Sequence, residues 1–247
     1  MRPSLTIIAV FLVLFFASCE DKKSSQKSAA ETVADKLEEP DSTETAVAQN
    51  NSEEKEETSK ELGDAYPIPQ EKLIPFLTEY GKKNPENKVR IKTSYGDIEV
   101  RLFRDTPLHR ANFIMLVKNG YFDDTYFHRV APGFVIQGGN SDNISTNKMR
   151  HNIGSYLIPS EFDAGHKHTY GAFSAAKYSE QNVSKASSPY EFFIVMDKGG
   201  TPHLNNEHTV FGEVISGMDV AEKISQVETG QSEWPIDNVY MDVEIIE

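Results

Sequence analysis

The strongest constraint on the fold is a two-residue alternation of apolar and polar side chains that begins near residue 88. Apolar residues occupy every second position over 89–91 and again over 98–102, with charged residues between them. The intervening segment 95–97, Tyr-Gly-Asp, is typical of a hairpin turn. Strands with this alternation have one buried face and one solvated face. The sequence therefore predicts an antiparallel sheet that starts with a hairpin.

Six further short strands and two helices are expected beyond the hairpin. The strands lie near residues 126–130, 134–137, 170–174, 192–196, 210–214 and 239–246. One helix has Thr106 as its N-cap and Pro107 at its first position, and it ends at Gly120. The other covers 218–225. Many short strands with only two core helices favour a mainly β fold, a closed barrel capped by helices.

A short amphipathic helix is predicted before the barrel. Apolar residues gather on one side of the segment 71–80, and Gly81 is a natural end for this helix. Pro75 lies inside the segment, where proline normally interrupts a helix. We interpret residues 66–87 as a helical extension that packs on the domain that follows.

The first residues are typical of an export signal. Arg2 precedes an apolar run over 5–16, whose 12 residues are fewer than the roughly 20 that a membrane-spanning helix needs. Residues 16–19, Phe-Ala-Ser-Cys, resemble a lipobox, in which the cysteine is lipidated. Cys19 is the only cysteine, so it has no intramolecular disulfide partner. We predict a lipoprotein signal peptide over 1–18 and a lipid on Cys19. The alternative is an incidental cysteine after an ordinary signal peptide.

Residues 19–65 carry most of the negative charge. Positions 20–65 hold 14 acidic and 6 basic residues, which contribute −8 of the total charge of −13. Without a periodic apolar pattern, such a segment cannot bury enough apolar surface to offset its ordering entropy. We expect a disordered acidic tether, with the protein anchored in the cell envelope on the periplasmic or surface-exposed face of the outer membrane. The acidity argues against nucleic acid as a partner, because phosphate binding needs clustered Lys and Arg.

The most informative motif is Phe-His-Arg-Val-Ala-Pro-Gly-Phe-Val-Ile-Gln-Gly-Gly over residues 127–139. Tyr-Gly-Asp-Ile precedes it at 95–98, and Glu-Phe-Phe-Ile at 191–194 and His-Thr-Val-Phe-Gly-Glu-Val at 208–214 follow it. In this order the segments resemble the cyclophilins. The resemblance extends over 89–246 and implies an eight-stranded antiparallel barrel with a helix over each end. It also implies a peptidyl-prolyl cis-trans isomerase domain over 88–247, with its site in a groove on the outer surface.

The resemblance also implies which residues form the site. Arg129 would be the principal catalytic group, because a guanidinium stays charged and can donate to the prolyl nitrogen when the peptide bond is twisted. Gln137 would orient the substrate carbonyl or Arg129 through its side-chain amide, and Phe134 and His208 would complete the catalytic set. The positions implied for substrate binding are Val135, Ala176, Lys177, Glu191, Phe193, His203 and Leu204.

The implied partners are proline-containing polypeptides. Rotation about a peptide bond needs no general base, so we assign no proton transfer to His208. His166 and His168 form a His-x-His pair without a third ligand, and we interpret it as a loop and expect no metal. No nucleotide-binding motif is present, so no cofactor is expected. Nothing in the sequence suggests an obligate interface, and we expect a monomer.

Some positions depart from the family pattern. Glu191 stands where cyclophilins usually have glutamine, and a carboxylate near Arg129 would pair with it and compete with substrate. Lys177 changes the rim of the groove, and His203 stands where some members have tryptophan. The leading hypothesis is an active isomerase that assists the folding of exported proteins near a membrane. The alternatives are a proline-binding module without turnover, which an Arg129–Glu191 pair would favour, and a purely structural lipoprotein.

Overall fold

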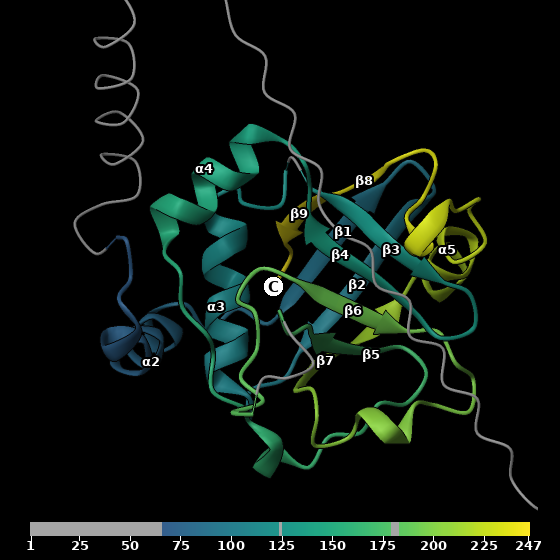
Figure 1. Ribbon diagram of the computed structural model, residues 1–247. Helices are drawn as coiled ribbons and strands as arrows, with labels where there is room; N and C mark the ends of the chain where they lie inside the picture. Colours follow the sequence, from purple (N-terminus) through teal and green to yellow (C-terminus); the bar gives the residue numbers. More distant parts are fainter. Residues whose placement is uncertain (1–65, 124, 179–182) are drawn as a thin grey trace, which may run out of the picture. The chain divides into compact units, whose positions relative to one another are not determined.

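The computed structural model describes residues 66–123, 125–178 and 183–247 (Figure 1). The predicted signal peptide over 1–18, the lipidation site Cys19 and the predicted tether over 19–65 lie outside the described residues. Within the described ranges, no helix is both long enough and apolar enough to cross a membrane.

A single antiparallel sheet dominates the fold, as the alternation predicts. Its strands over the described residues are β1 (Lys88–Thr93), β2 (Gly96–Leu102), β3 (Tyr126–Ala131), β4 (Val135–Asn140), β5 (Ala172–Ala175), β6 (Phe192–Val195), β7 (Val210–Ser216), β8 (Val239–Tyr240) and β9 (Asp242–Ile245). Their order in the sheet is β8-β3-β4-β6-β5-β7-β2-β1-β9.

The two ends of this sheet are consecutive in the chain, so the sheet forms a nearly closed barrel. Only Met241 separates β8, which pairs with β3, from β9, which pairs with β1. The backbone N–H of Met241 donates to the carbonyl of Thr125 at 3.0 Å, and its side chain is buried. The prediction of one last strand over 239–246 is therefore wrong. The chain changes pairing partner at Met241, which makes nine strands where eight were expected.

Helices lie around the barrel (Figure 1). In the described ranges they are α2 (Leu73–Lys83), α3 (Pro107–Lys118), α4 (Ile144–Ile153) and α5 (Met218–Ile224), with the 3₁₀ helices η1 (Gln70–Lys72), η2 (Phe162–Ala164), η3 (Pro202–Leu204) and η4 (Gln231–Glu233). Figure 1 shows α3 and α5 on opposite sides of the strands. These are the two core helices that the sequence predicts, and α2 packs against α3.

Two features of the helices differ from the prediction. The sequence analysis predicted no helix at α4, because the apolar residues of this segment form no regular stripe. In the structure Ile144, the first residue of α4, is 75% exposed. Gly81 does not end α2, which continues to Lys83. An added Cβ at Gly81 would lie 3.1 Å from the Cβ of Ala111, so the glycine permits close approach to α3. Pro75 falls in the first turn of α2, where its missing N–H removes no helical hydrogen bond.

Aromatic rings pack the barrel interior around Phe113 of α3. Its ring centroid lies 4.8–5.9 Å from those of Phe122, Phe173, Phe192 and Phe211. Tilted and edge-to-face contacts of this kind are favourable for aromatic rings. A cavity of only about 10 Å³ lies beside this cluster, which is room for one water molecule at most. This cavity is therefore too small to hold a larger molecule.

A distant carboxylate, rather than Thr106, caps the N-terminus of α3. Thr106 makes no side-chain capping bond, and its hydroxyl donates to the carbonyl of Phe103. Glu161 accepts hydrogen bonds from the backbone N–H groups of Leu108 and His109, each at 3.0 Å, and from Nδ1 of His109 at 2.6 Å. Negative charge is favourable at a helix N-terminus, so Glu161 fixes α3 to the segment that precedes η2.

We expect Glu161→Ala to lower the free energy of unfolding by about 2 kcal/mol, because it leaves two backbone donors and a buried imidazole without their acceptor. Chemical denaturation monitored by circular dichroism measures the change. Glu79→Ala is the matched control, since Glu79 is exposed and pairs only with Lys82 of its own helix. Equal stability of the Glu161 variant and the parent would contradict this account of the cap.

Candidate active site

The alternation of the strands separates the core from an outer apolar cluster. In β6, Phe192 and Ile194 belong to the interior core, whereas Phe193 and Val195 belong to a second cluster on the other face. In β4, Ile136 is interior and Val135 belongs to the second cluster. Because successive side chains of a strand point to opposite faces, this second cluster lies on the outer wall of the barrel.

An open cavity of about 260 Å³ lies over this cluster. Its walls are the side chains of Arg129, Phe134, Val135, Gln137, Ala176, Lys177, Phe193, Leu204 and His208. All nine are site residues in the sequence-based prediction. The two other predicted residues, Glu191 and His203, lie next to the cavity without lining it.

The register of the strands brings the central residues together. Arg129 of β3 is opposite Gln137 of β4, and Gln137 is opposite Phe193 of β6. Side chains directly opposite each other in neighbouring antiparallel strands lie close together on the same face. Three adjacent strands thus present a guanidinium, an amide and an aromatic ring in a row.

Rings of histidine and phenylalanine form the apolar part of the cavity. The ring of Phe193 stacks on His168 at 5.8 Å and meets His208 edge-on at 5.3 Å. Nδ1 of His208 donates to the carbonyl of Ala175 at 3.0 Å, which fixes the orientation of its ring. His203 stacks on Phe134 at 5.7 Å. Because Phe134 lines the cavity, His203 supports its wall.

The segment after β5 forms the rim. The N–H of Ala176 donates to the carbonyl of Glu191 and its carbonyl accepts from the N–H of Ser188, which holds Ala176 at the cavity wall. The side chain of Lys177 is only 1% exposed, and its Nζ lies 3.5 Å from Glu207. The rim therefore carries a buried ammonium group beside a carboxylate.

The carboxylate paired with Arg129 comes from Glu233 of η4. Nε of Arg129 donates to Oε2 of Glu233 at 2.7 Å, and both side chains are partly exposed. The Arg129 guanidinium also lies over the ring of Phe134, 5.8 Å from its centroid, a cation–π geometry. The predicted pairing of Arg129 with Glu191 is wrong. Glu233 is 104 positions away in the sequence, and no local pattern connects it with Arg129.

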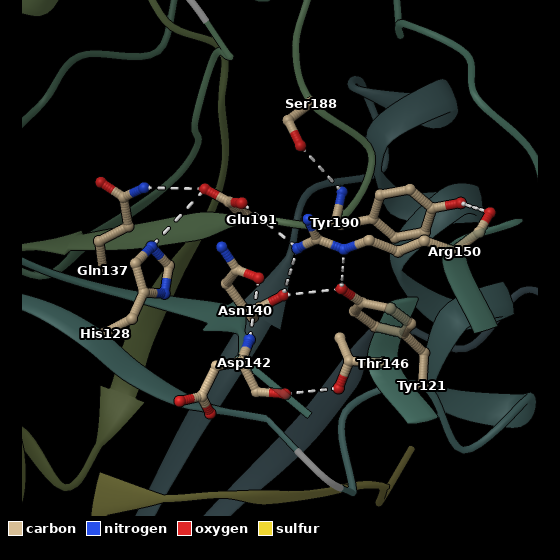
Figure 2. Close-up of polar contacts among 12 residues, drawn as sticks. Tyr121, His128, Gln137, Asn140, Asp142, Thr146, Arg150, Ser188, Tyr190 and Glu191 are labelled. Carbon is tan, nitrogen blue, oxygen red and sulfur yellow. Dashed lines mark hydrogen bonds and ion pairs between the residues drawn. The ribbon is translucent and has the colours of Figure 1, made fainter. Parts of the chain in front are cut away.

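Glu191 is instead part of a buried polar network beside the cavity (Figure 2). Its carboxylate accepts from Nε2 of Gln137 at 3.1 Å and from Arg150 of α4 at 3.3 Å. Nε2 of His128 is 3.6 Å away. Burial acts to raise the pKa of Glu191, but its contacts with His128 and Arg150 outweigh burial and hold the pKa below its usual value. The carboxylate is therefore ionised next to Gln137.

His168 is a site residue that the sequence analysis interpreted as part of a loop. It is 2% exposed and lies directly behind Phe193. Its backbone N–H and Nδ1 donate to Oδ1 of Asn205, both at 3.0 Å, and Nε2 is 3.0 Å from the hydroxyl of Ser174. Burial lowers the pKa of His168 to about 4, so the ring is neutral. A His-x-His pattern in a sequence does not indicate that one of its histidines packs against a phenylalanine of the site.

His166, the other member of the pair, lies elsewhere. It stacks on Phe103 at 4.0 Å and contacts Asp105 at 2.9 Å. Over the residues that the structure describes, no group of three or more His, Cys, Asp or Glu side chains is arranged to hold a metal ion.

Comparison with known proteins connects this geometry to a family. The family model described as "Cyclophilin type peptidyl-prolyl cis-trans isomerase/CLD" matches residues 88–244. The chain belongs to the cyclophilin-type peptidyl-prolyl cis-trans isomerases. As a cyclophilin it is an isomerase enzyme with the antiparallel barrel of that family.

Its relatives come from diverse organisms. Peptidyl-prolyl cis-trans isomerase A of Dickeya dadantii is 37% identical over 61% of this chain and 77% of its own length. Peptidyl-prolyl cis-trans isomerase-like 2 of Rhizopus delemar is 37% identical over 63% of this chain, but the match covers only 28% of that protein. The crystal structure of a cyclophilin-type isomerase from Cryptosporidium parvum covers 66% of this chain, with 29% identity and a TM-score of 0.56. A second structure of that protein was obtained in the presence of the dipeptide Ala-Pro.

The neutral His168 predicts a loss of stability in acid. An unfolded histidine titrates near pH 6.5, so below that value the unfolded chain binds more protons than the folded protein. We expect the free energy of unfolding to fall by about 2 kcal/mol through this residue as the pH drops from 6.5 towards 4. Urea titrations at several pH values should show a smaller pH dependence in His168→Gln, which has no titratable group. An identical pH dependence in parent and variant would contradict this assignment.

Proposed function

We propose that the groove accelerates rotation about X-Pro peptide bonds by stabilising the twisted bond, with Arg129 as the principal group. The rotation barrier of about 18–20 kcal/mol arises from amide resonance. In the twisted state the prolyl nitrogen regains a lone pair, which a guanidinium can bind as a hydrogen-bond donor. Lowering the barrier by about 4 kcal/mol would accelerate the rotation roughly a thousandfold. No covalent step or proton transfer is needed.

The observation that carries this proposal is the row of Arg129, Gln137 and Phe193 at the edge of an apolar cavity. The walls formed by Phe134, Phe193 and Leu204 suit a proline ring, and the polar pair is next to where the preceding peptide bond would lie. The structure of the Cryptosporidium relative obtained with Ala-Pro supports a proline-containing ligand here. We propose that Gln137 positions the substrate through its side-chain amide.

A proline-binding module with little turnover is the second candidate. It is favoured by the contact between Arg129 and Glu233, because substrate must compete with this carboxylate for the guanidinium. Both side chains are partly exposed, and exposed ion pairs contribute only about 1 kcal/mol or less. We therefore favour turnover, with Glu233 as a weak competitor.

Isomerisation of an Ala-Pro peptide, measured by NMR exchange, separates the two candidates. We expect Arg129→Ala to lower kcat/KM roughly a hundredfold or more, because it removes the main donor to the twisted bond. Arg101→Ala is the matched control, since Arg101 is exposed and pairs with Glu213 away from the groove. A folded parent that binds the peptide without accelerating its isomerisation would establish the binding module instead.

We also propose that the enzyme acts as a monomer on proline-containing segments of exported proteins and so assists their folding. The support is the signal-like run before Cys19 and the acidic stretch after it, which would anchor the domain to the outer membrane through a lipid and a tether. The net charge of −13 argues against nucleic acid as a partner.

Cys19→Ser tests the anchor. In a Gram-negative host fed radioactive palmitate, we expect the parent to be labelled and to sediment with membranes. The variant should be unlabelled and leave the membrane fraction, because a hydroxyl cannot form the thioether to the lipid. Absence of label from the parent, or label in both proteins, would contradict lipidation at Cys19.

A further inference from the structure

The buried carboxylate of Glu191 lies beside the side-chain amide of Gln137, a proposed catalytic group. The side chain of Glu191 is only 11% exposed and lies outside the cavity wall. One of its oxygens, Oε2, accepts from Gln137 Nε2 at 3.1 Å, and the other, Oε1, contacts Nη2 of Arg150 at 3.3 Å. A charge that is buried at this depth requires compensation. Arg150 of α4 supplies it together with His128 of β3.

Arg150 is itself held at several points (Figure 2). Its Nε donates to the hydroxyl of Tyr121 at 2.8 Å, and its Nη2 donates to the carbonyl of Gly139 at 3.2 Å. The guanidinium lies over the ring of Tyr190, 5.1 Å from the centroid. The Tyr190 hydroxyl donates to the carbonyl of Gly154 at 2.6 Å, which ties down the end of α4. The position of Arg150 is therefore fixed before substrate arrives.

The contact with Glu191 determines which way the Gln137 amide faces. A carboxylate only accepts hydrogen bonds, so the amide must turn its NH₂ group to Glu191. Its oxygen then points away from Glu191, and the Gln137 side chain lines the cavity. A neutral partner such as glutamine both donates and accepts, and would allow either orientation of the amide.

We propose that Arg150 and Glu191 are positioning residues for catalysis: Arg150 keeps the Glu191 carboxylate charged, and Glu191 holds the Gln137 amide with its oxygen towards the substrate. This inference rests on the proposed role of the groove in X-Pro isomerisation. A protonated Glu191 would be able to donate to the Gln137 oxygen and reverse the amide. Arg150 prevents this reversal.

Several titratable groups surround Glu191 in addition to Arg150. His128 reaches it from β3, and Tyr121, Tyr178 and Tyr190 lie near it. Burial raises the pKa of each of these three tyrosines above the ordinary value, so they stay neutral between pH 5 and pH 9. His128 contacts the same carboxylate, and a His128→Asn background removes this contact.

The decisive experiment is to measure kcat and KM of the full chain between pH 5 and pH 9 for Arg150→Met. We expect kcat to fall about tenfold or more at neutral pH with little change in KM, because the amide is misoriented while the apolar pocket is intact. The loss should be larger at pH 5.5 than at pH 8.5, since an unpaired buried carboxylate protonates more readily. The same pH dependence should persist in the His128→Asn background.

The double variant Arg150→Met/Glu191→Gln removes both charges together. We expect this variant to be as stable as the parent, to have a lower kcat than the parent, and to have no pH dependence of kcat. If the pair had only a structural role, a variant with the stability of the parent would not show a lowered kcat. Arg150→Lys should recover part of the activity, because it restores the charge without the fixed fork of donors. Arg101→Met is the control for an arginine outside the groove, and its activity should equal that of the parent.

Two outcomes would overturn the inference. One is a parent-like kcat and pH profile in Arg150→Met. The other is an activity loss that follows the unfolded fraction, measured by circular dichroism, at every pH. Arg129→Ala, assayed in parallel, separates the two proposals. If Arg129→Ala loses activity and Arg150→Met does not, the groove is catalytic. In that case only the inference about Arg150 and Glu191 fails.

Discussion

Closure of the sheet at Met241 is the constraint on which the other parts of the structure depend. Two short strands, β8 and β9, bind opposite ends of the same sheet and are separated by one residue. In a nearly closed sheet, the interior and exterior faces are set by the alternation of side chains. The barrel therefore encloses an interior of packed aromatic rings and carries the open cavity on its outer wall.

The groove on that wall combines two carboxylates that differ in environment. Glu233 contacts Arg129 where both side chains meet solvent, so the contact is weak and exchangeable. Glu191 contacts Gln137 in a buried network and is balanced by Arg150. The exposed carboxylate thus competes for a guanidinium, whereas the buried carboxylate orients an amide. The difference between the two roles follows from their exposure to water.

The resemblance to a known family named the groove residues, and strand register brings the central ones together. Arg129, Phe134, Val135 and Gln137 lie on one hairpin, and a motif of consecutive residues shows them directly. The predicted alternation also indicated the antiparallel barrel and its two core helices. These features depend on local periodicity and on neighbouring strands, which a linear pattern records.

Features that depend on contacts between distant segments could not be predicted in the same way. Glu161 caps α3, Glu233 contacts Arg129, and Arg150 compensates Glu191, each across many residues of sequence. His168 gained a supporting role only because its loop passes behind Phe193. A single sequence gives the identity of such charged groups but not their partners, since many exposed positions are chemically equivalent until the chain folds.

The pairing that closes the barrel also has a kinetic consequence. Tyr126 pairs with Tyr240 and Val89 pairs with Ile245, so closure joins segments from opposite ends of the domain. Folding rates fall as the mean sequence separation of contacting residues rises, because loop entropy is lost before distant contacts compensate for it. The barrel should therefore fold slowly for its size. The fold of this isomerase depends on pairing between segments that are distant in the sequence.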